Sequence, residues 1–491
     1  MCNRFFILAI LFTNLSSAQN IFIGPSGDFE NLEAAESSML PGDTIFIMDG
    51  VYSNGTQFLT INGMPGKPIV IKAMNRHQAI FQGGTESIHL VDCSYVIIDG
   101  LVIQGQTGNG MNIDDGGDYA TPAHHITIRN CIFQDMMASG NNDLLKLSGL
   151  DDFTITNNEF SRGGAGGSGV DMVGCHRGII QENYFDDSGV SGIQAKGGTQ
   201  HILIRGNIFK DLSQRALNLG GSTGLQFFRP PLPNPIVDAF EAADLEVHSN
   251  VFIRSWAPVA FVGCVRVKVY NNTIYDPQNW VIRILQETTE PGFLTCADNE
   301  FVNNIVYLSD DLREVNIGPN TNPESFTFSN NLWYNAMDAG NWLPDLPVTD
   351  IDQLITNPKL VDPENGDFDI EEDSPAIGSG LFLADTITDF DTEPFVNPPS
   401  IGAFEGAVTT SNFEKFMHAE LSVFPNPASD FIFISTNEEV LGISIFDLNG
   451  RIVYKTNSNS ENISMLGYEP GIYFVRVHWV DGILTRKVIV E

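Results

Sequence analysis

The chain has 491 residues, a formal net charge of −36 and a hydrophobic content of 42%. The hydrophobic content excludes a disordered chain, and the acidic balance argues against a nucleic-acid-binding protein, which needs clustered lysine and arginine. The length exceeds one ordinary domain but suits a solenoid, because each coil contacts only its neighbours. Between Lys196 and Arg283 basic residues outnumber acidic ones. This region either attracts an anionic substrate or is a chance fluctuation.

The first residues of the chain have the pattern of a signal peptide, which we assign to residues 1–18. Arg4 precedes a short apolar run at residues 5–12, and small residues follow through Ala18, after which we expect cleavage. The run is too short to span a bilayer, and we expect no transmembrane segment later in the chain. The protein is therefore expected to leave the cytoplasm.

The cysteines that remain after this cleavage are odd in number and scattered. Such a set is not typical of a disulfide framework, so we expect buried free thiols. They are Cys93, Cys131, Cys175, Cys264 and Cys296. No CxxC pair or Cys/His cluster indicates a zinc site.

A phrase made of an apolar run, an asparagine and an aromatic or aliphatic residue recurs through the middle of the chain. Most copies lie about 25 residues apart, and each contains short β-type runs without a helical pattern. This period predicts a right-handed parallel β-helix over residues 19–406, with the asparagines stacked inside it as scaffold. The repeating asparagines are Asn130, Asn158, Asn183, Asn207, Asn250, Asn272, Asn304 and Asn331.

The end of the chain has a different pattern. Residues 407–416 form a polar linker, and residues 417–491 combine alternating apolar positions with an Asn449-Gly450 turn. This combination predicts a small antiparallel β-sandwich. The expected fold class is all-β, a parallel β-helix followed by this small domain.

The longest interval of the repeat follows Asn207 and predicts a lateral loop over residues 222–242. The loop contains Phe227, Phe228 and Arg229 next to a pair of prolines. Loops on rigid scaffolds often carry function, so these three residues are candidates for binding a substrate in a groove beside the loop. The two phenylalanines either stack on sugar faces or plug the loop onto the coil.

Strand alternation places Gln194 and Lys196 on the outward side of the coil before this loop. Aligning this coil with the next one on their glycines places Arg215 outward as well, so that only the long side chains of Lys196 and Arg215 would meet. Arg283, from a later coil, is a second candidate arginine. A lysine beside arginines suits β-elimination from a uronate, in which an arginine or a cation neutralises the sugar carboxylate and the lysine takes the proton. The alternative is that Lys196 is a solvated surface lysine.

Other candidate residues have weaker signals. Asp171 shares the outward alignment of Gln194 and is a candidate substrate or metal contact, and His176 at a coil turn is a candidate binding residue. Glu241 ends the lateral loop, where it either contacts substrate or has a surface role. Asp171 and Glu241 are also the facing carboxylates that a glycoside hydrolase would need. A glycine-rich acidic turn either binds calcium or caps its own backbone; its carboxylates are Asp114, Asp115 and Asp118.

The entry to the solenoid, residues 42–52, resembles the first coils of the chondroitinase B and alginate lyase-like β-helix family. Lys196 followed by the phrase at residues 205–209 is similar to the segment that carries the catalytic lysine of that family. The resemblance implies a parallel β-helix and a lysine base at Lys196. The catalytic arginine of the family would fall near Leu219, and its acidic calcium ligands are absent just before Lys196.

The tail resembles the type A sorting domain of the type IX secretion system of Bacteroidota. The resemblance rests on Pro425-Asn426-Pro427, on residues 471–477 and on the final strand at residues 487–491. It implies passage over the outer membrane by the type IX machinery, followed by release or attachment to the cell surface.

Together these features predict a secreted, carbohydrate-active β-helix protein, most simply a lyase that cleaves an acidic, uronate-containing polysaccharide by β-elimination. A non-catalytic surface protein that binds glycans or a partner, and a β-helix glycoside hydrolase, are the alternatives. We expect a monomer with no nucleic-acid partner. The cofactor requirement stays open, with calcium as the candidate.

Overall fold

The computed structural model describes residues 18–339, 342–384, 387–406, 421–436, 440–447, 452–456, 462–468, 470–479 and 482–490. The expected signal peptide, apart from Ala18, and the expected linker at residues 407–416 lie outside the described residues. The chain divides into two compact units, Met1–Asn357 with Ala376–Glu405, and Pro358–Pro375 with Gly406–Glu491.

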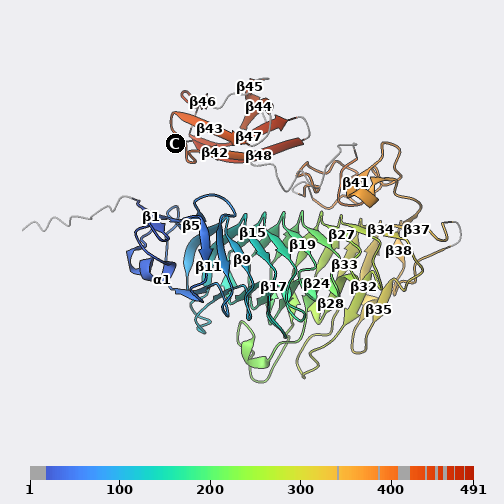
Figure 1. Cartoon of the computed structure of the whole chain (residues 1–491). Helices are drawn as coiled ribbons and strands as arrows, with labels where there is room; N and C mark the ends of the chain where they lie inside the picture. The colour runs from blue at the N-terminus through green and yellow to red at the C-terminus, as the bar shows by residue number, and fades with distance from the viewer. Residues whose placement is uncertain are drawn as a thin grey trace, which may run out of the picture. The chain divides into compact units, whose positions relative to one another are not determined.

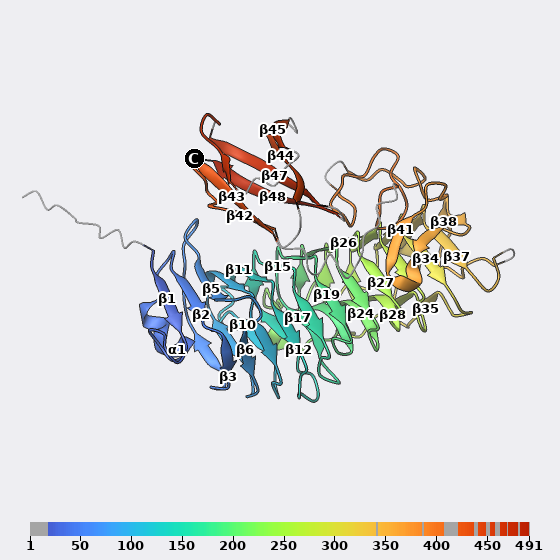
Figure 2. The ribbon, with the colours of Figure 1, turned by 45° about the horizontal axis from the view of Figure 1, so that its top comes forward.

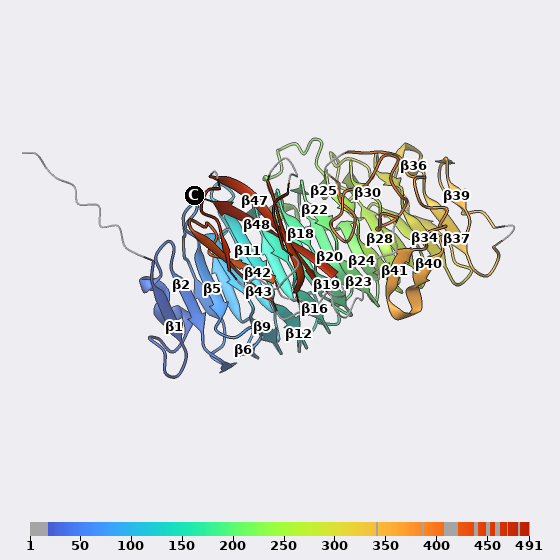
Figure 3. The ribbon, with the colours of Figure 1, turned by 90° about the horizontal axis from the view of Figure 1, so that it is seen from above.

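The first unit is a parallel β-helix whose strands line up in three long sheets, here named A, B and C (Figure 1). Each coil passes from sheet A through sheet B to sheet C, and the coils stack in chain order (Figure 2). Seen from above, the strands of sheet A lie side by side along the stack (Figure 3). The all-β solenoid expected from the repeat is therefore confirmed.

The strands of sheet A are β1 (Asn20–Ile23), β2 (Thr44–Ile47), β5 (Ile69–Ala73), β8 (Ser94–Asp99), β11 (Ala123–Arg129), β14 (Leu150–Asp151), β15 (Thr154–Thr156), β18 (Ile179–Gln181), β22 (Leu203–Arg205), β26 (Glu246–His248), β30 (Lys268–Tyr270), β33 (Glu300–Val302), β36 (Thr327–Ser329) and β38 (Asp350–Ile351). Those of sheet B are β3 (Gly50–Tyr52), β6 (Ala79–Gln82), β9 (Val102–Gln104), β12 (Ile132–Gln134), β16 (Glu159–Ser161), β19 (Tyr184–Asp186), β23 (Ile208–Lys210), β27 (Val251–Ile253), β31 (Thr273–Tyr275), β34 (Ile305–Leu308), β37 (Leu332–Asn335) and β39 (Leu354–Ile355).

The strands of sheet C are β4 (Gln57–Leu59), β7 (Ile88–Val91), β10 (Met111–Asp114), β13 (Leu145–Ser148), β17 (Ser168–Val173), β20 (Ser191–Lys196), β24 (Arg215–Gly220), β28 (Ala257–Val262), β32 (Ile282–Leu285) and β35 (Val315–Ile317). A short further sheet joins β21 (Thr199–Gln200), β25 (Ala242–Ala243) and β29 (Cys264–Val265). The helical turns of this unit are α1 (Leu32–Ala35), η1 (Glu36–Ser38), η2 (Leu225–Phe227) and η3 (Pro323–Ser325).

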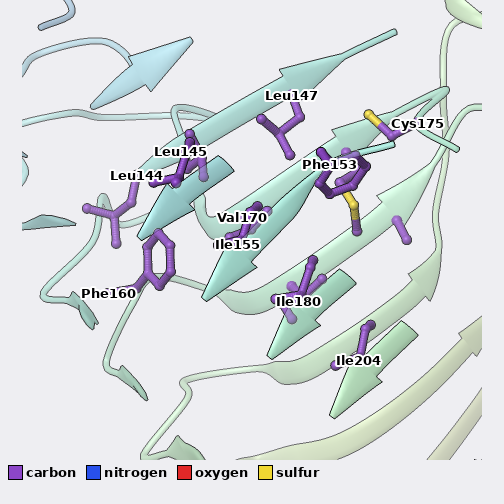
Figure 4. Close-up of a cluster of buried hydrophobic side chains, with 14 of the residues drawn as sticks. Leu144, Leu145, Leu147, Phe153, Ile155, Phe160, Val170, Cys175, Ile180 and Ile204 are labelled. Atoms are coloured by element: carbon purple, nitrogen blue, oxygen red, sulfur yellow. The ribbon is translucent and has the colours of Figure 1, made fainter. Parts of the chain in front are cut away.

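The interior of the coils is apolar because alternate strand residues point inward. Leu145 and Leu147 of β13, Val170 of β17 and Ile180 of β18 are among these buried side chains (Figure 4). Phenylalanines at equivalent positions of sheet B stack face to face in consecutive coils, with ring centroids 4.8 to 5.0 Å apart. They are Phe133, Phe160, Phe185, Phe209 and Phe252.

The repeating asparagines form a buried ladder. In each step the side-chain amide and the backbone N–H of one asparagine both donate to the Oδ1 of the next, as Asn183 does to Asn207 at 3.0 Å. The ladder consists of Asn158, Asn183, Asn207, Asn250, Asn272, Asn304 and Asn331. Asn130 does not belong to it, because Cys131 occupies the ladder position of that coil and donates its backbone N–H to Asn158.

The second unit contains an antiparallel pair, β40 (Leu360–Asp362) and β41 (Asp367–Ile370), with the turn η4 (Pro363–Asn365), and the antiparallel strands of the tail. The tail strands are β42 (Leu421–Phe424), β43 (Phe431–Thr436), β44 (Val440–Asp447), β45 (Ile452–Thr456), β46 (Asn462–Ser464), β47 (Gly471–Trp479) and β48 (Gly482–Val490). They form two sheets around an apolar core of their own. In the part of the chain that the structure describes, no helix is long and apolar enough to cross a membrane.

Candidate functional site

The outward positions of sheet C carry a row of mostly polar side chains. Parallel pairing sets one residue of each strand beside its neighbour, about 4.8 Å apart. In order along the stack these residues are His89, Asn112, Lys146, Asp171, Gln194, Asn218, Ala260, Arg283 and Asn316. We call this set the polar row. All of its members except Ala260 have side chains that are capable of hydrogen bonding, so this face of sheet C concentrates groups that could act on a ligand.

Asp171 is the centre of a charged cluster in the polar row. Its carboxylate is inaccessible to solvent, forms an ion pair with Lys146 through one oxygen, and lies 3.3 Å from the Lys196 ammonium through the other. Asp143 approaches Lys146 to 3.8 Å. We name these four residues the Asp171 cluster. Lys196 is only 8% exposed, so it is not the solvated surface lysine of the alternative interpretation.

The Asp171 cluster contains a carboxyl group that titrates near neutral pH. Burial, and then the nearby Asp171 carboxylate, raise the pKa of Asp143 from 3.8 to about 7. Burial alone would lower the pKa of Lys146, but the Asp171 and Asp143 carboxylates outweigh it and raise that pKa above its ordinary value. Lys146 therefore stays protonated, whereas Asp143 can exchange a proton under ordinary conditions.

Gln194 and Lys196 lie under the backbone of the next coil. A Cβ added at Gly221 would stand 2.9 Å from Gln194 Nε2 and 3.4 Å from the Lys196 side chain, and Gly221 has a φ of 153°. A side chain larger than hydrogen would therefore cover both polar groups. The glycine leaves room above Gln194, whose own side chain remains half-buried.

Arg215 does not stand where the alignment on glycines expects it. Arg215 pairs with Ser191, and Leu219 pairs with Ala195. The alignment on glycines is therefore wrong by one residue. The correct register turns Leu217 and Leu219 inward, where both are fully buried, and resolves the awkward outward placement of these leucines. The backbone positions of Arg215 and Lys196 are then separated by the whole length of β20.

The side chain of Arg215 nevertheless reaches the polar row. Its guanidinium donates to Asn218 Oδ1 at 2.7 Å and lies 3.0 Å from the Glu287 carboxylate. Asn218 stands beside Gln194 in the polar row. The guanidinium is thus held between Asn218 of its own strand and Glu287, which follows β32 on the side of the stack away from β20 and Lys196.

Arg283 lies in the polar row against two tryptophans. Its guanidinium carbon is 4.4 Å from the ring centroid of Trp280 and 5.8 Å from that of Trp256, and the two rings meet edge to face. Burial and the neighbouring Arg215 lower the pKa of Arg283. The Nε atoms of both arginines are buried without a hydrogen-bond partner among the described residues. Two neighbouring guanidiniums that share one carboxylate, Glu287, leave a local excess of positive charge, which is suited to binding an anion.

The lateral loop, which projects below β17 and β24 in Figure 1, is fastened to the coils by Arg229. The guanidinium donates to both oxygens of Asp151, at 2.5 and 3.0 Å, and to the carbonyl of Gly174 at 3.0 Å. His176 is buried beside it, with Nδ1 3.3 Å from Arg229 Nη1. Burial and the Arg229 charge lower the pKa of His176. Arg229 and His176, both expected to bind substrate, are thus engaged in holding the loop.

Glu241 fastens the other end of the loop. Its fully buried carboxylate accepts hydrogen bonds from the backbone N–H of Gly197 at 2.9 Å, from Thr223 and from the Thr288 hydroxyl. Both members of the expected hydrolase pair, Asp171 and Glu241, are therefore inaccessible to solvent.

The two phenylalanines of the loop have different surroundings. Phe228 is 2% exposed and packs edge to face on Phe293 with ring centroids 5.3 Å apart, whereas Phe227 is 57% exposed. Phe228 therefore plugs the loop onto the coils, and Phe227 presents an apolar face to solvent.

The acidic turn caps its own backbone. Each carboxylate accepts the N–H two residues further on, at 2.9, 2.9 and 3.0 Å for Asp114, Asp115 and Asp118. The other oxygen of Asp114 lies 2.6 Å from His89, and hydrogen bonds with Asp114 and Glu86 raise the pKa of His89 to about 9. Within the described ranges no group of three or more His, Cys, Asp or Glu side chains is arranged to hold a metal ion.

Several residues of this face were not expected from the sequence: Asp143, Lys146, Asn218, Glu287, Trp256 and Trp280. Lys146 had a usable signal, because the inward pair Leu145 and Leu147 aligns its strand with Val170 and Met172 and sets Lys146 beside Asp171. The tryptophans had none, since they precede β28 and β32 in irregular segments.

Comparisons with known proteins support both parts of the chain. Residues 82–229 match the family model described as a right-handed β-helix region, and residues 422–491 match that of a secretion system C-terminal sorting domain. These matches confirm the handedness of the solenoid and the sorting domain at the tail. No curated protein matches the sequence.

Solved structures that resemble the chain include carbohydrate-active β-helices at low identity. Pectate lyase Pel9A is 15% identical with a TM-score of 0.48, over 80% of this chain and 98% of that one. Alginate lyase from Paenibacillus sp. str. FPU-7 is 16% identical with a TM-score of 0.41, over 62% and 97%. The GH136 lacto-N-biosidase from Eubacterium ramulus is 13% identical with a TM-score of 0.34, over 69% and 67%.

Proposed function

We propose that this protein is a secreted polysaccharide lyase that holds a uronate-containing glycan along the polar row of sheet C and cleaves it by β-elimination. The observation that carries the proposal is the proximity of two positively charged side chains, Arg215 and Arg283. Their charges lie close enough to lower the pKa of Arg283, and each keeps a buried Nε–H without a partner among the described residues. The carboxylates of a uronate polymer, bound beside these two guanidiniums, would relieve the repulsion between the cations.

The proposed reaction begins with neutralisation of the uronate carboxylate by Arg215, which makes the C5 proton more acidic. Once Lys196 has moved away from Asp171 and released its proton to solvent, its amine takes the C5 proton, the C4–C5 double bond forms, and the C4–O bond breaks. The leaving oxygen gains a proton from water, and Lys196 returns its proton to solvent. Gln194, which is half-buried beside Asn218 in the polar row, would bind a sugar hydroxyl.

Arg283 and the tryptophans would bind the neighbouring part of the glycan. Arg283 stands two strands beyond Asn218 in the polar row, about 10 Å away by strand spacing. This distance suits a carboxylate further along an extended polysaccharide. Trp256 and Trp280 offer apolar ring surface for sugar faces. Phe227 of the lateral loop, which is 57% exposed, offers a further apolar ring surface for a sugar.

A non-catalytic glycan-binding protein is the second candidate. It is favoured by one observation, the burial of Lys196 against Asp171. A base must be neutral and must reach the C5 proton, and a lysine held in an ion pair meets neither condition until Asp171 releases it. In this second function the polar row binds the same acidic polysaccharide and leaves it intact.

We further propose that the type IX machinery carries the protein across the outer membrane after removal of the signal peptide, and that it acts as a monomer outside the cell. The match of residues 422–491 to a sorting domain supports this route.

Binding to acidic and neutral polysaccharides tests the proposed site. Purified protein is titrated with alginate, polygalacturonate, chondroitin and ulvan, and with neutral xylan as the comparison. We expect affinity for at least one uronate polymer, weakened by added salt because the contact is ionic. Equal affinity for the neutral polymer, or no binding to any acidic polymer, would refute an anion site on sheet C.

A further inference from the structure

Two of the buried cysteines lie directly beside each other in neighbouring coils. Val265 pairs with Ala297 in parallel register, which sets Cys264 opposite Cys296, and the Ala297 N–H donates to the Cys264 carbonyl at 3.3 Å. Adjacent parallel strands keep opposite Cα atoms about 4.8 Å apart, within the range of about 4.4 to 6.8 Å that a disulfide bridges. Both side chains are fully buried and point into the same core.

The two thiols share one polar neighbour, the side chain of Asn299. Asn299 bridges them, since its Nδ2 lies 3.8 Å from Cys296 Sγ and its Oδ1 lies 3.9 Å from Cys264 Sγ. The thiolate of either cysteine can be the nucleophile in thiol–disulfide exchange.

We propose that Cys264 and Cys296 form a disulfide bond in the exported protein. Before these coils pack, the thiolate of one cysteine attacks a disulfide of a thiol–disulfide oxidoreductase outside the cytoplasm, and the thiolate of the other cysteine then resolves the mixed disulfide. One disulfide forms in the chain, the two cysteines lose two electrons and two protons, and the oxidoreductase is reduced to its dithiol. The sorting domain indicates a protein that leaves the reducing cytoplasm, where such bonds do not persist.

The bond would close the segment between the two cysteines, which contains the loop at residues 286–295. This loop supplies Glu287 to Arg215, the Thr288 hydroxyl to Glu241, and Phe293 to the lateral loop. The Gln286 side chain accepts the Cys296 N–H at 2.7 Å, so the base of the loop lies at the proposed bridge. The disulfide would therefore lock both the lateral loop and the carboxylate beside Arg215 in place.

The bond is tested by counting thiols in the full chain secreted by its own host. The protein is denatured in iodoacetamide without reductant, and each cysteine peptide is analysed by mass spectrometry. Of the five cysteines of the described chain, we expect alkylation of Cys93, Cys131 and Cys175 only, together with one disulfide-linked peptide pair. After reduction all five should be alkylated. Alkylation of all five without reductant would overturn the proposal, as would a link between any other pair.

Two variants separate the bond from general effects on folding. In Cys264→Ser, Cys296 should become alkylated without reductant, and the loop at residues 286–295 should be cut faster by a protease. In Cys175→Ser, which removes a buried thiol outside the pair, the linked peptides and the cleavage rate should not change. If Cys264→Ser is not secreted, the peptide map of the native protein still decides the question. Equal cleavage of both variants would contradict the proposed lock.

Discussion

Arg215 and Glu287 form an ion pair between coils of sheet C, with Nη2 3.0 Å from Oε1. Glu287 belongs to the loop that follows β32, the strand that carries Arg283. The ion pair therefore connects Arg215, at the start of β24, to the coil of Arg283. Two cations and one carboxylate then share a small region of a strongly acidic protein. This local excess of positive charge is the physical basis of the predictions on binding.

Replacing Arg283 with alanine should weaken binding of the acidic polysaccharide at least about tenfold, or about 1.4 kcal/mol, because a charge-assisted contact is lost. Isothermal titration at low salt measures the change. Arg266→Ala is the matched control, since this arginine is half-exposed and pairs with Asp244 outside the polar row. An equal loss of affinity in Arg266→Ala would mean that the overall charge of the protein, and not a contact made by Arg283, determines binding.

Lys196→Met should abolish elimination and keep most of the glycan affinity, because the arginines remain. It should also lower stability by about 1–3 kcal/mol, since Asp171 loses one of its two cations in a buried setting. Chemical denaturation measures this loss. Lys210→Met is the control, because that lysine is partly exposed and its ion pair with Asp186 contributes little. Full elimination activity in Lys196→Met would exclude this lysine as the base.

Asp143 should make stability depend on pH. With its pKa raised from 3.8 to about 7 in the folded state, the folded protein binds a proton between these values that the unfolded chain has released. Raising the pH through this window therefore lowers the free energy of unfolding, by at most about 1.4 kcal/mol per pH unit.

The Asp143→Asn variant isolates this contribution. Its stability relative to the native protein should improve as the pH rises from 5 to about 7, as measured by urea denaturation. Asp389, whose pKa burial also raises to about 7, contributes to both proteins and cancels in the difference. Denaturation midpoints that stay a constant distance apart at every pH would contradict the proposed titration of Asp143.

Asn207→Ala should destabilise the β-helix by about 1–3 kcal/mol for each buried group left unpaired. The substitution removes the acceptor used by Asn183 and the donors to Ile180 and Arg205. Asn54→Ala, at an exposed asparagine, should leave the denaturation midpoint within error. An unchanged midpoint in Asn207→Ala, with a loss of activity, would mean that the ladder serves the site rather than the scaffold.

The fold could be predicted because its signals are local and repeated. The asparagine ladder and the stacked phenylalanines recur once per coil. They can therefore be recognised from the two-residue alternation within strands together with the repeat length of the coils. Asn130 shows the limit of this reasoning. It stands one residue before the ladder position, and only the hydrogen bonds reveal that Cys131 occupies that position.

The site could be predicted only in part, because its contacts depend on the register between coils. Lys196 and Gln194 were identified from alternation, but a shift of one residue moved Arg215 along its strand. Arg229 reaches Asp151 from 78 residues away, and no local pattern marks such a pair. Exposed aromatic and basic residues of a loop can equally bind a ligand or fasten the loop, and only the contacts decide between them.

Elimination itself is the most direct test of the proposed function. Purified protein is incubated with alginate, polygalacturonate, chondroitin and ulvan, and the ultraviolet absorbance of unsaturated uronates is followed over time. We predict a rise in absorbance with at least one of these polymers, lost in Lys196→Met and retained in Lys210→Met. Tight binding of an acidic polymer with no rise in absorbance for any of them would contradict the lyase and leave a glycan-binding protein.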